Sequence, residues 1–257
     1  MKVSTYNVAS VRARLPLLLE WIAENEPDIL SLQETKVEDD KFPASDFEDL
    51  GYHLTLHGQK SWNGVAILSR GVPTKVIRGF EDDLWPSDAR LVAAEIDGVQ
   101  IINTYVPNGS SVTSDKFVYK LRWLERFNRF LRERFLPDQP LLWMGDINIA
   151  PTPIDVYNSP RFYGGVGHHP EEMLRLSRIV EWGLTDVFRE HHPEKGFYTF
   201  WDFVLPKGVE RNLGWRIDHI YATRPLADVC SECVIDKDAR QAEKPSDHTI
   251  VTADFDW

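Results

Sequence analysis

An Asp-Gly pair at positions 97–98 constrains the fold of this chain more than any other short feature. It separates two β-rich runs, Leu91–Ile96 and Gln100–Val106. Asp-Gly between such runs is the strongest short-range signal for a β-hairpin, so at least part of the sheet is antiparallel. A purely parallel α/β fold is therefore excluded.

Helical periodicity limits the fold further. Apolar residues recur at helical spacing in three segments: Leu15–Asn25, Lys116–Phe135 and Glu171–Trp182. Short apolar runs predict six further strands: Val3–Asn7, Ile29–Gln33, Val65–Ser69, Leu141–Ile147, Ile217–Ala222 and Thr249–Phe255. Because the helices exclude a plain β-sandwich, the pattern is best fitted by packed sheets covered by helices, in one α/β domain over residues 1–257.

Composition and charge narrow the class of protein. The 257 residues include only two Cys, which excludes a disulfide scaffold. No apolar run reaches the roughly 18–20 residues of a membrane span, and the N-terminus lacks the apolar centre of a signal peptide. We therefore expect an intracellular, cytoplasmic monomer that does not contact membranes. The net charge of −11 argues against nucleic-acid binding unless the basic residues gather on one face.

Polar side chains of catalytic type stand at the ends of several predicted strands. They are Asn7, Glu34, Asp146, Asn148, Asp218, Asp247 and His248. Taken singly, each has a structural explanation as a turn residue, a cap or an Asx-turn. Taken together they indicate a site, because ligands bind just beyond strand ends, where the backbone is held rigidly.

The residue types in this set favour a hard metal ion. Several carboxylates that converge without a cation would repel one another, and their pKa values would rise. Carboxylate and amide oxygens with one His and no Cys suit Mg²⁺ or Mn²⁺ rather than Zn²⁺. Such a set could hydrolyse a phosphate ester, since the metal neutralises charge, an acid acts on water and an imidazolium faces the phosphate oxygen.

Eight short motifs occur in the order known from one family. They are Tyr6–Val8, Pro27–Lys36, Asn63–Ala66, Asn103–Asn108, Gly145–Asn148, Tyr198–Trp201, Gly214–His219 and Glu243–His248. On these motifs, which span nearly the whole chain, the sequence resembles the exonuclease III / abasic-site endonuclease family, within the larger group that includes DNase I. The resemblance implies a four-layer α/β sandwich of two packed mixed β-sheets flanked by helices.

The resemblance also implies a cofactor and its ligands. Glu34 is expected to be the principal ligand of Mg²⁺, for which Mn²⁺ can substitute. The rest of the expected metal set is Asn7, Asp146, Asn148 and Asp247. Position 9 is Ala where relatives often carry Asp or Asn, so we expect one contact fewer around the metal. Whether one ion or two take part stays open.

Catalytic roles follow from the same resemblance. Asp146 would orient or deprotonate the attacking water, although the identity of the general base stays open. Asn148 and Tyr105 would hold the phosphate. His248, fixed by Asp218, would stabilise the developing negative charge.

The expected partner is double-stranded DNA with abasic sites or 3′ ends. Residues 115–134 hold seven Lys or Arg against three acids, so this helix is a candidate for backbone contacts; a solvated helix face is the alternative. The residues expected to contact the DNA backbone are Lys36, Asn108, Lys116 and Lys120. The resemblance assigns Phe200, Trp201, Trp215 and Ile217 to a pocket for an extruded sugar, and ordinary core packing is the alternative.

Other candidate motifs carry less weight. Cys230-x-x-Cys233 lacks the second pair or the following His that would indicate redox or zinc chemistry. His219 alternates with Asp218 on its strand and is expected to point away from the site. The remaining paired histidines are interpreted as loop residues: His168, His169, His191 and His192.

The sequence is therefore interpreted as a Mg²⁺-dependent DNA repair nuclease that cuts 5′ to abasic sites and removes nucleotides 3′ to 5′, in base excision repair. One alternative is a phosphatase or phosphodiesterase of the same superfamily acting on inositol phosphates, lipids or RNA; Phe200, Trp201 and Trp215 favour DNA. Another alternative is a DNA-binding protein that has lost catalysis. The presence of every expected catalytic residue argues against it.

Overall fold

Two six-stranded sheets form within residues 1–82 and 88–257, the part of the chain that the computed structural model describes. The strand order of the first sheet is β11 (Cys230–Asp236), β12 (Ile250–Phe255), β1 (Lys2–Asn7), β2 (Ile29–Gln33), β4 (Val65–Ser69) and β3 (His53–His57). That of the second is β5 (Thr74–Arg78), β6 (Leu91–Ile96), β7 (Val99–Tyr105), β8 (Leu141–Asp146), β10 (Asp218–Thr223) and β9 (Leu184–Asp186). In each sheet one pair is parallel, β1 with β2 and β7 with β8, and the others are antiparallel.

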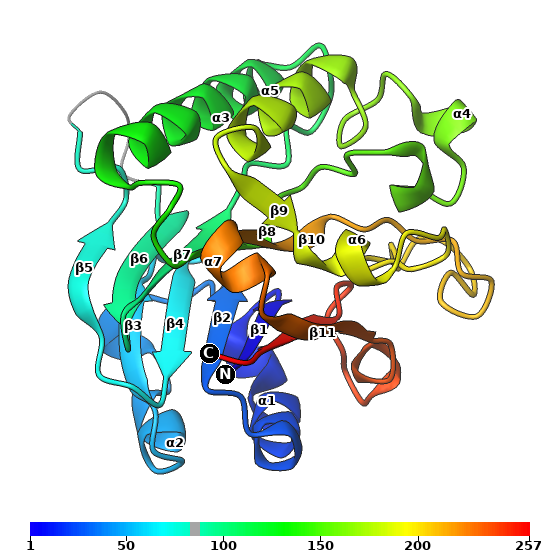
Figure 1. The fold of residues 1–257 in the computed structure, drawn as a ribbon. Coiled ribbons are helices and arrows are strands. Elements are labelled where there is room, and N and C mark those ends of the chain that lie inside the picture. The colour runs from blue at the N-terminus through cyan, green and yellow to red at the C-terminus, as the bar shows by residue number, and fades with distance from the viewer. Residues whose placement is uncertain (83–87) are drawn as a thin grey trace.

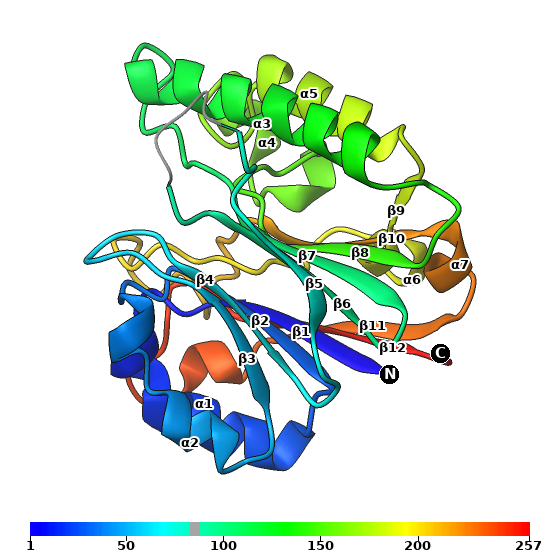
Figure 2. The same cartoon turned by 90° about the vertical axis from the view of Figure 1, so that its left-hand side faces the viewer.

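Helices cover the outer face of each sheet and complete four layers (Figure 1, Figure 2). α1 (Val11–Asn25) and α2 (Ala44–Glu48) pack on the first sheet, and α3 (Asp115–Arg134) and α5 (Pro170–Val180) pack on the second. The shorter helices are α4 (Ser159–Phe162), α6 (Val187–His191) and α7 (Arg224–Ala227), with 3₁₀ turns at Asp39–Lys41, Pro153–Asp155 and Ala239–Gln241. No helix in the described residues is long and apolar enough to cross a membrane. The predicted four-layer sandwich is confirmed.

The Asp-Gly hairpin forms between β6 and β7 as predicted. Ile96 pairs with Val99 across the turn, and Asp97 and Gly98 have φ angles of 49° and 83°. Positive φ at both central residues is the type I′ geometry, whose twist matches that of the flanking strands. The dipeptide therefore sets the register of this part of the second sheet.

The predicted strands all form, with bounds within one residue of the prediction. Helix α1 begins four residues earlier than predicted, because the Ser10 side chain caps it by accepting the N–H of Ala13. The four edge strands, β3, β5, β9 and β11, were not predicted from the sequence. An edge strand buries less of its surface, so its sequence carries a weaker apolar pattern.

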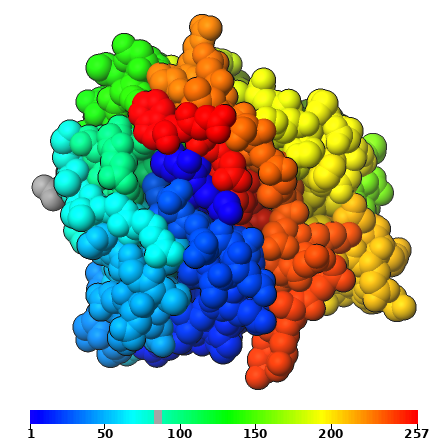
Figure 3. Space-filling model, turned by 60° about the horizontal axis from the view of Figure 1, so that its bottom comes forward, coloured from blue at the N-terminus to red at the C-terminus, as the bar shows by residue number. Residues whose placement is uncertain are grey.

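The two ends of the chain lie side by side (Figure 3). Strand β1 runs antiparallel to β12 through pairs such as Val3 with Ala253. The Met1 amino group also donates a hydrogen bond to the Phe255 carbonyl (2.5 Å). The first and last strands therefore occupy the centre of the same sheet.

A buried group of charges links three segments behind the second sheet. Arg216 is 1% exposed and donates to Asp155 Oδ1 through Nε (2.7 Å) and to Asp186 through both terminal nitrogens (3.1 and 2.7 Å). Arg189 also donates to Asp155. Because Asp155 follows β8, Asp186 ends β9 and Arg216 precedes β10, these bonds fix the loops that leave the sheet here.

We expect Asp155→Asn to lower the free energy of unfolding at pH 7 by about 3–5 kcal/mol, because removing one partner leaves a buried charge uncompensated. Urea unfolding followed by circular dichroism measures the change. Arg224→Gln, which removes an exposed pair with Asp228, is the control and should change the free energy little. Equal losses in the two variants would contradict this account.

The same variant should alter the pH dependence of stability. Burial raises the pKa values of Asp155 and Asp186, but Arg216 outweighs it and holds both below the usual value. The stabilisation is therefore complete above about pH 5 and is lost as the pH falls below about 4. Between pH 6 and pH 3 the unfolding free energy of Asp155→Asn should fall less steeply than that of the unmodified protein.

Candidate active site

Polar strand ends from both sheets meet at one end of the sandwich. The parallel pairs β1–β2 and β7–β8 end here, and the Asn7 amide joins Glu34 of one sheet to Asp146 of the other. Asp218 pairs with Asp146 across β10 and β8. A cavity of about 480 Å³ opens over this edge, and the predicted site residues among its lining are Glu34, Tyr105, Asn108, Asp146, Asn148, Asp247 and His248.

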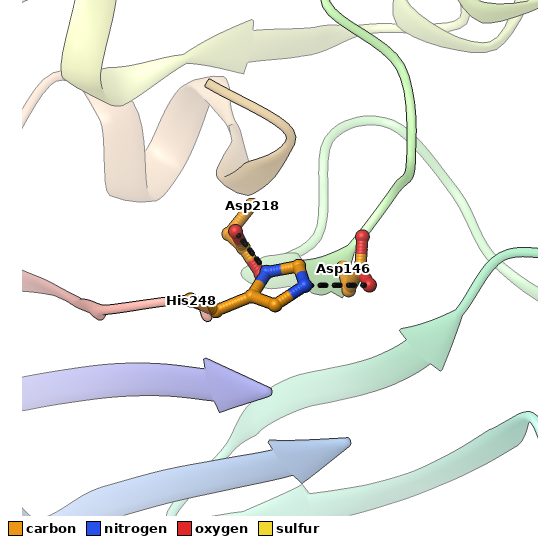
Figure 4. Close-up of side chains that lie close together, drawn as sticks. All are labelled: Asp146, Asp218 and His248. Atoms are coloured by element: carbon orange, nitrogen blue, oxygen red, sulfur yellow. Dashed lines mark hydrogen bonds and ion pairs between the residues drawn. The ribbon is translucent and has the colours of Figure 1, made fainter. Parts of the chain in front are cut away.

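Asp218, His248 and Asp146 form a buried array (Figure 4). His248 Nδ1 lies 2.8 and 3.0 Å from the two carboxylate oxygens of Asp218. His248 Nε2 faces Asp146 Oδ2 at 3.8 Å. Burial alone would lower the pKa of His248, but the Asp218 and Asp146 carboxylates outweigh it and raise that pKa to about 10. The imidazole is therefore held in its charged form and in a fixed orientation.

Asn7 connects a carboxylate of the first sheet's edge, Glu34, to a carboxylate of the second sheet, Asp146. Its Nδ2 donates to Glu34 Oε1 (2.9 Å) and to Asp146 Oδ2 (2.8 Å), while its Oδ1 accepts the N–H of Ala9 (3.0 Å). Asn7 is fully buried. The amide thus positions both carboxylates, and its predicted role as a metal ligand stays a prediction.

The pKa values of Asp146 and Glu34 are shifted in opposite directions. Burial raises the pKa of Asp146 to about 8, with Asp218 and Glu34 adding to the rise and His248 opposing it. Burial also acts on Glu34, but the Asn7 amide and the Lys36 ammonium, 2.8 Å away, lower its pKa below the usual value. The site therefore contains one carboxylate that stays ionised and one whose charge needs further compensation.

The carboxylates of this site fit a divalent cation, whereas the charged imidazole has no free lone pair to offer one. Ligand atoms of Asp146, Asp218 and His248 all lie within 4.8 Å of one another. A cation beside these carboxylates would lower the pKa of Asp146 and keep it ionised at neutral pH. The site thus has both the ligands and the electrostatic need for a metal ion.

Left-handed backbone occurs repeatedly around the site. Glu34, Lys36 and Asn148 have φ angles of 51°, 54° and 55°, and Ala9 and Asn63 are similar at 46° and 52°. Non-glycine residues adopt this conformation at a cost, and such residues gather at functional sites. Here it occurs just beyond the ends of β2 and β8, where Glu34 and Asn148 line the cavity.

Asn148 is fixed by hydrogen bonds from three directions. Its N–H donates to Asp146 Oδ1 (2.9 Å), which is an Asx-turn. Its Nδ2 donates to the Val106 carbonyl (3.0 Å), and its Oδ1 accepts from Asn108 Nδ2 (3.0 Å). Asp146 therefore forms an Asx-turn, and the predicted catalytic and metal-binding roles of both residues stay predictions.

Tyr105 completes the polar side of the cavity. Burial raises the pKa of its hydroxyl well above the usual value, and the Glu34 and Asp146 carboxylates add to the rise. The Arg90 guanidinium lies over the Tyr105 ring, 4.6 Å from its centre. The phenol therefore stays protonated and can donate a hydrogen bond.

An apolar wall faces these polar groups. Phe200, Trp215 and Ile217 line the cavity as predicted, and Phe200 bridges to both Trp215 and His248. The loop that follows the buried strand β8 contributes further cavity residues, none of which was predicted from the sequence: Tyr157, Arg161, Phe162, Val166 and Gly167. Only the position of the loop, directly after a buried strand, could have indicated them.

Two predicted DNA contacts are wrong. Lys120 is fully buried and pairs with Glu172 beneath the site, so it cannot reach a phosphate. Trp201 is 1% exposed and does not line the cavity, so it is a core residue. Lys116, by contrast, is exposed at the start of α3, Asn108 is exposed and lines the cavity, and Lys36 pairs with the cavity residue Glu34.

The weaker motifs have structural roles. Cys230 and Cys233 are free thiols on the edge strand β11. His219 Nε2 bonds to the Ile149 carbonyl, away from the array, as expected. His168, interpreted as a loop histidine, is buried between Ser159 and the Ala150 carbonyl.

Several known proteins are similar to this chain in sequence and in fold. A model of the Endonuclease/Exonuclease/phosphatase family matches residues 4–248. An exodeoxyribonuclease III from Haemophilus influenzae is 36% identical over 267 residues, which cover 99% of this chain and 100% of that protein. Among solved structures, an AP endonuclease from Archaeoglobus fulgidus has 44% identity and a TM-score of 0.97, and the 3′ phosphatase NExo from Neisseria, bound to a product DNA hairpin, has 39% and 0.96, each over 100% of both chains.

In the metal-free protein we expect His248 to stay protonated at pH 8, since its pKa is about 10. Asp218→Asn removes the carboxylate that contributes most to this rise, so the imidazole should lose its proton at a clearly lower pH. Imidazole NMR signals recorded against pH measure both titrations, with the exposed His53 as internal reference. Identical His248 titrations in the two proteins would show that Asp218 does not control its charge.

Proposed function

The chain belongs to the endonuclease/exonuclease/phosphatase family, and we propose that it is a Mg²⁺-dependent DNA repair nuclease. It hydrolyses the phosphodiester 5′ to an abasic site and removes nucleotides from the 3′ ends of duplex DNA. The observation that supports this most is the buried Asp218–His248–Asp146 array beside an apolar wall within one cavity.

The apolar wall explains the preference for a damaged strand. Phe200, Trp215 and Ile217 present apolar surface to a sugar that has left the helix. Extrusion costs a few kcal/mol, least where no base pair must be broken. A deoxyribose without its base therefore enters at a lower cost than an intact nucleotide.

Mg²⁺ is the cation that the ligands favour. Glu34 and Asp146 supply carboxylate oxygens, Asp247 lines the same cavity, and no Cys is near enough to line it. When bound, Mg²⁺ would neutralise charge on the phosphate, and Mn²⁺ could replace it. Because His248 is charged and has no free lone pair, the carboxylates rather than the imidazole would be the principal ligands.

His248 and Asp146 divide the proton chemistry between them. Charged His248 directs Nε2 toward the cavity, where it donates to the phosphate oxygen on which negative charge develops. Ionised Asp146 accepts the proton of the attacking water. The 3.8 Å between Nε2 and Asp146 Oδ2 is longer than a hydrogen bond, so the two groups remain available to substrate.

Tyr105 and Asn148 hold the phosphate in line. The protonated phenol of Tyr105 donates one hydrogen bond. Asn148 uses one amide hydrogen on the Val106 carbonyl and keeps the other for substrate. Since the Asx-turn and Asn108 already fix Asn148, little orientation is lost on binding.

A second candidate activity is removal of a phosphate from a DNA 3′ end. The Neisseria relative is named as a 3′ phosphatase and was solved with a product DNA hairpin. The same array could serve both reactions, since each breaks a phosphate ester. Substrates based on inositol, lipid or RNA are less favoured because the named relatives act on DNA.

One assay tests the proposal. A labelled duplex with a single abasic analogue is incubated with and without Mg²⁺, alongside an intact duplex and a duplex that ends in a 3′ phosphate, and products are sized on a gel. We expect Mg²⁺-dependent cleavage 5′ to the lesion and slower shortening of 3′ ends. Loss of the terminal phosphate alone would favour the second candidate, and no cleavage of any DNA would overturn both.

We expect Glu34→Gln and Asp146→Asn to fail for different reasons. Glu34→Gln should bind metal weakly, so raising Mg²⁺ should partly restore activity. Asp146→Asn should still bind DNA but lose about 10²–10⁴-fold in kcat, since it no longer accepts a proton. Single-turnover rates across a Mg²⁺ series decide this, and equal rescue of both variants would contradict the division of roles.

Trp215→Ala tests the pocket wall. If Trp215 faces an extruded sugar, the variant should fold and keep its exonuclease activity but lose much of its preference for abasic over intact duplex. If Trp215 is a core residue instead, truncation should cost roughly 3–5 kcal/mol of stability and depress all activities together. Melting curves and both assays are compared with Trp257→Ala, an exposed tryptophan; a folded variant with unchanged discrimination would rule out the pocket.

A further inference from the structure

We propose that Lys120 is a positioning residue, which holds the Asn148 and Asn108 backbone from beneath the active site and, through Glu172, fixes the cavity wall at Gly167. The inference rests on the proposed nuclease function. It concerns a residue that the sequence had placed on the DNA, and it is carried by the contacts of the buried ammonium and carboxylate.

The ammonium of Lys120 donates two hydrogen bonds and forms one ion pair. Nζ donates to the carbonyl of Asn148 (2.7 Å) and to the carbonyl of Asn108 (3.1 Å), and it forms an ion pair with Glu172 Oε1. Both charged side chains are fully buried. The stem of Lys120 also packs under Gly109, where a Cβ would lie 3.3 Å from its Cδ.

Glu172 continues the same connection on the other side. Its Oε2 accepts the N–H of Gly167 (2.8 Å) and the N–H of His169 (3.1 Å), which caps the start of α5. A Cβ at Gly167 would lie 3.4 Å from the Trp215 ring and 3.6 Å from the Asn148 carbonyl oxygen. The Lys120–Glu172 pair therefore joins the phosphate side of the cavity to its apolar wall.

Stability alone does not explain a charged pair in this position. Removing an ammonium and a carboxylate from water costs several kcal/mol per ion, and well-packed apolar residues of similar size are often as stable. The buried carbonyl of Asn148, however, needs a donor, and the same ammonium also reaches the carbonyl of Asn108. Asn148 is also in the left-handed region, at φ 55°. A lysine can donate to both carbonyls and pair with Glu172 from a single ammonium group.

The test compares Lys120→Met with Lys116→Met. Both remove one positive charge from α3, but Lys116 lies one turn earlier and is exposed. Lys120→Met should lower kcat on the abasic duplex by about 10–100-fold, since small displacements of catalytic groups have effects of this size, and should leave KM nearly unchanged. Lys116→Met should raise KM and weaken its dependence on salt, with kcat within about two-fold.

A double-mutant cycle with Asn148→Ala separates positioning from general destabilisation. If Lys120 acts through Asn148, Lys120→Met should change kcat by less than about two-fold in the Asn148→Ala background. Lys120→Met/Glu172→Gln guards against misfolding, because it leaves no unpaired buried charge and Gln keeps the acceptor for Gly167. That variant should also show the lowered kcat.

Hydrogen exchange gives a readout that needs no activity. The N–H groups of Gly167 and Asn148 should exchange faster in Lys120→Met, while those of β2, in the other sheet, should not. Unchanged exchange, or a kcat loss that multiplies fully with that of Asn148→Ala, would overturn the inference. Since wild-type turnover of the abasic duplex is measured first, failure of the proposed function is recognised separately.

Discussion

Like charges held close together in a buried space govern the architecture of this site. Glu34, Asp146 and Asp218 come from three strands of two sheets, and in an apolar interior their mutual repulsion would favour protonation. Asn7 bridges two of them with its amide, and His248 stands between the other pair as a cation. Both compensating groups are themselves buried and fixed, so they offset part of the repulsion without disordering the site. The pKa of Asp146 nevertheless stays raised, and a divalent cation beside it would supply the missing positive charge.

The parallel pairs explain why two separate sheets can build one such centre. Strands β1 and β2 end at the same edge as β7 and β8, so residues from both halves of the chain converge on it. Loops there can adopt costly left-handed conformations because the strands behind them are rigid. The same placement accounts for substrate binding by a chain of net charge −11. Positive groups at the cavity are His248 and Arg161, and Lys36 pairs with Glu34 beside them.

The sequence was sufficient for elements with a strong apolar pattern and for polar residues at their ends. Strands buried on both faces, such as β8, were bounded to within one residue, whereas the four edge strands were not recognised. The array of Asp146, Asp218 and His248 was predicted by residue number because motif order located each member. The cavity residues Arg161 and Gly167 were not predicted. They lie in a loop, where no repeating apolar pattern indicates which way a side chain points.

Lys120 shows most clearly why sequence alone could not complete the site. In a helix where most charged residues are exposed, one lysine looks like its neighbours, and helical spacing relates it to Lys116 on the same side. Burial is decided by what packs above it: the loop through Asn108 and Gly109 on one side and α5 on the other. These segments meet Lys120 through the backbone carbonyls of Asn108 and Asn148 and the side chain of Glu172, contacts that no apolar pattern indicates. A residue that supports a site from behind is therefore specified by the site's unmet donors and acceptors, which become visible only when the loops are placed in three dimensions.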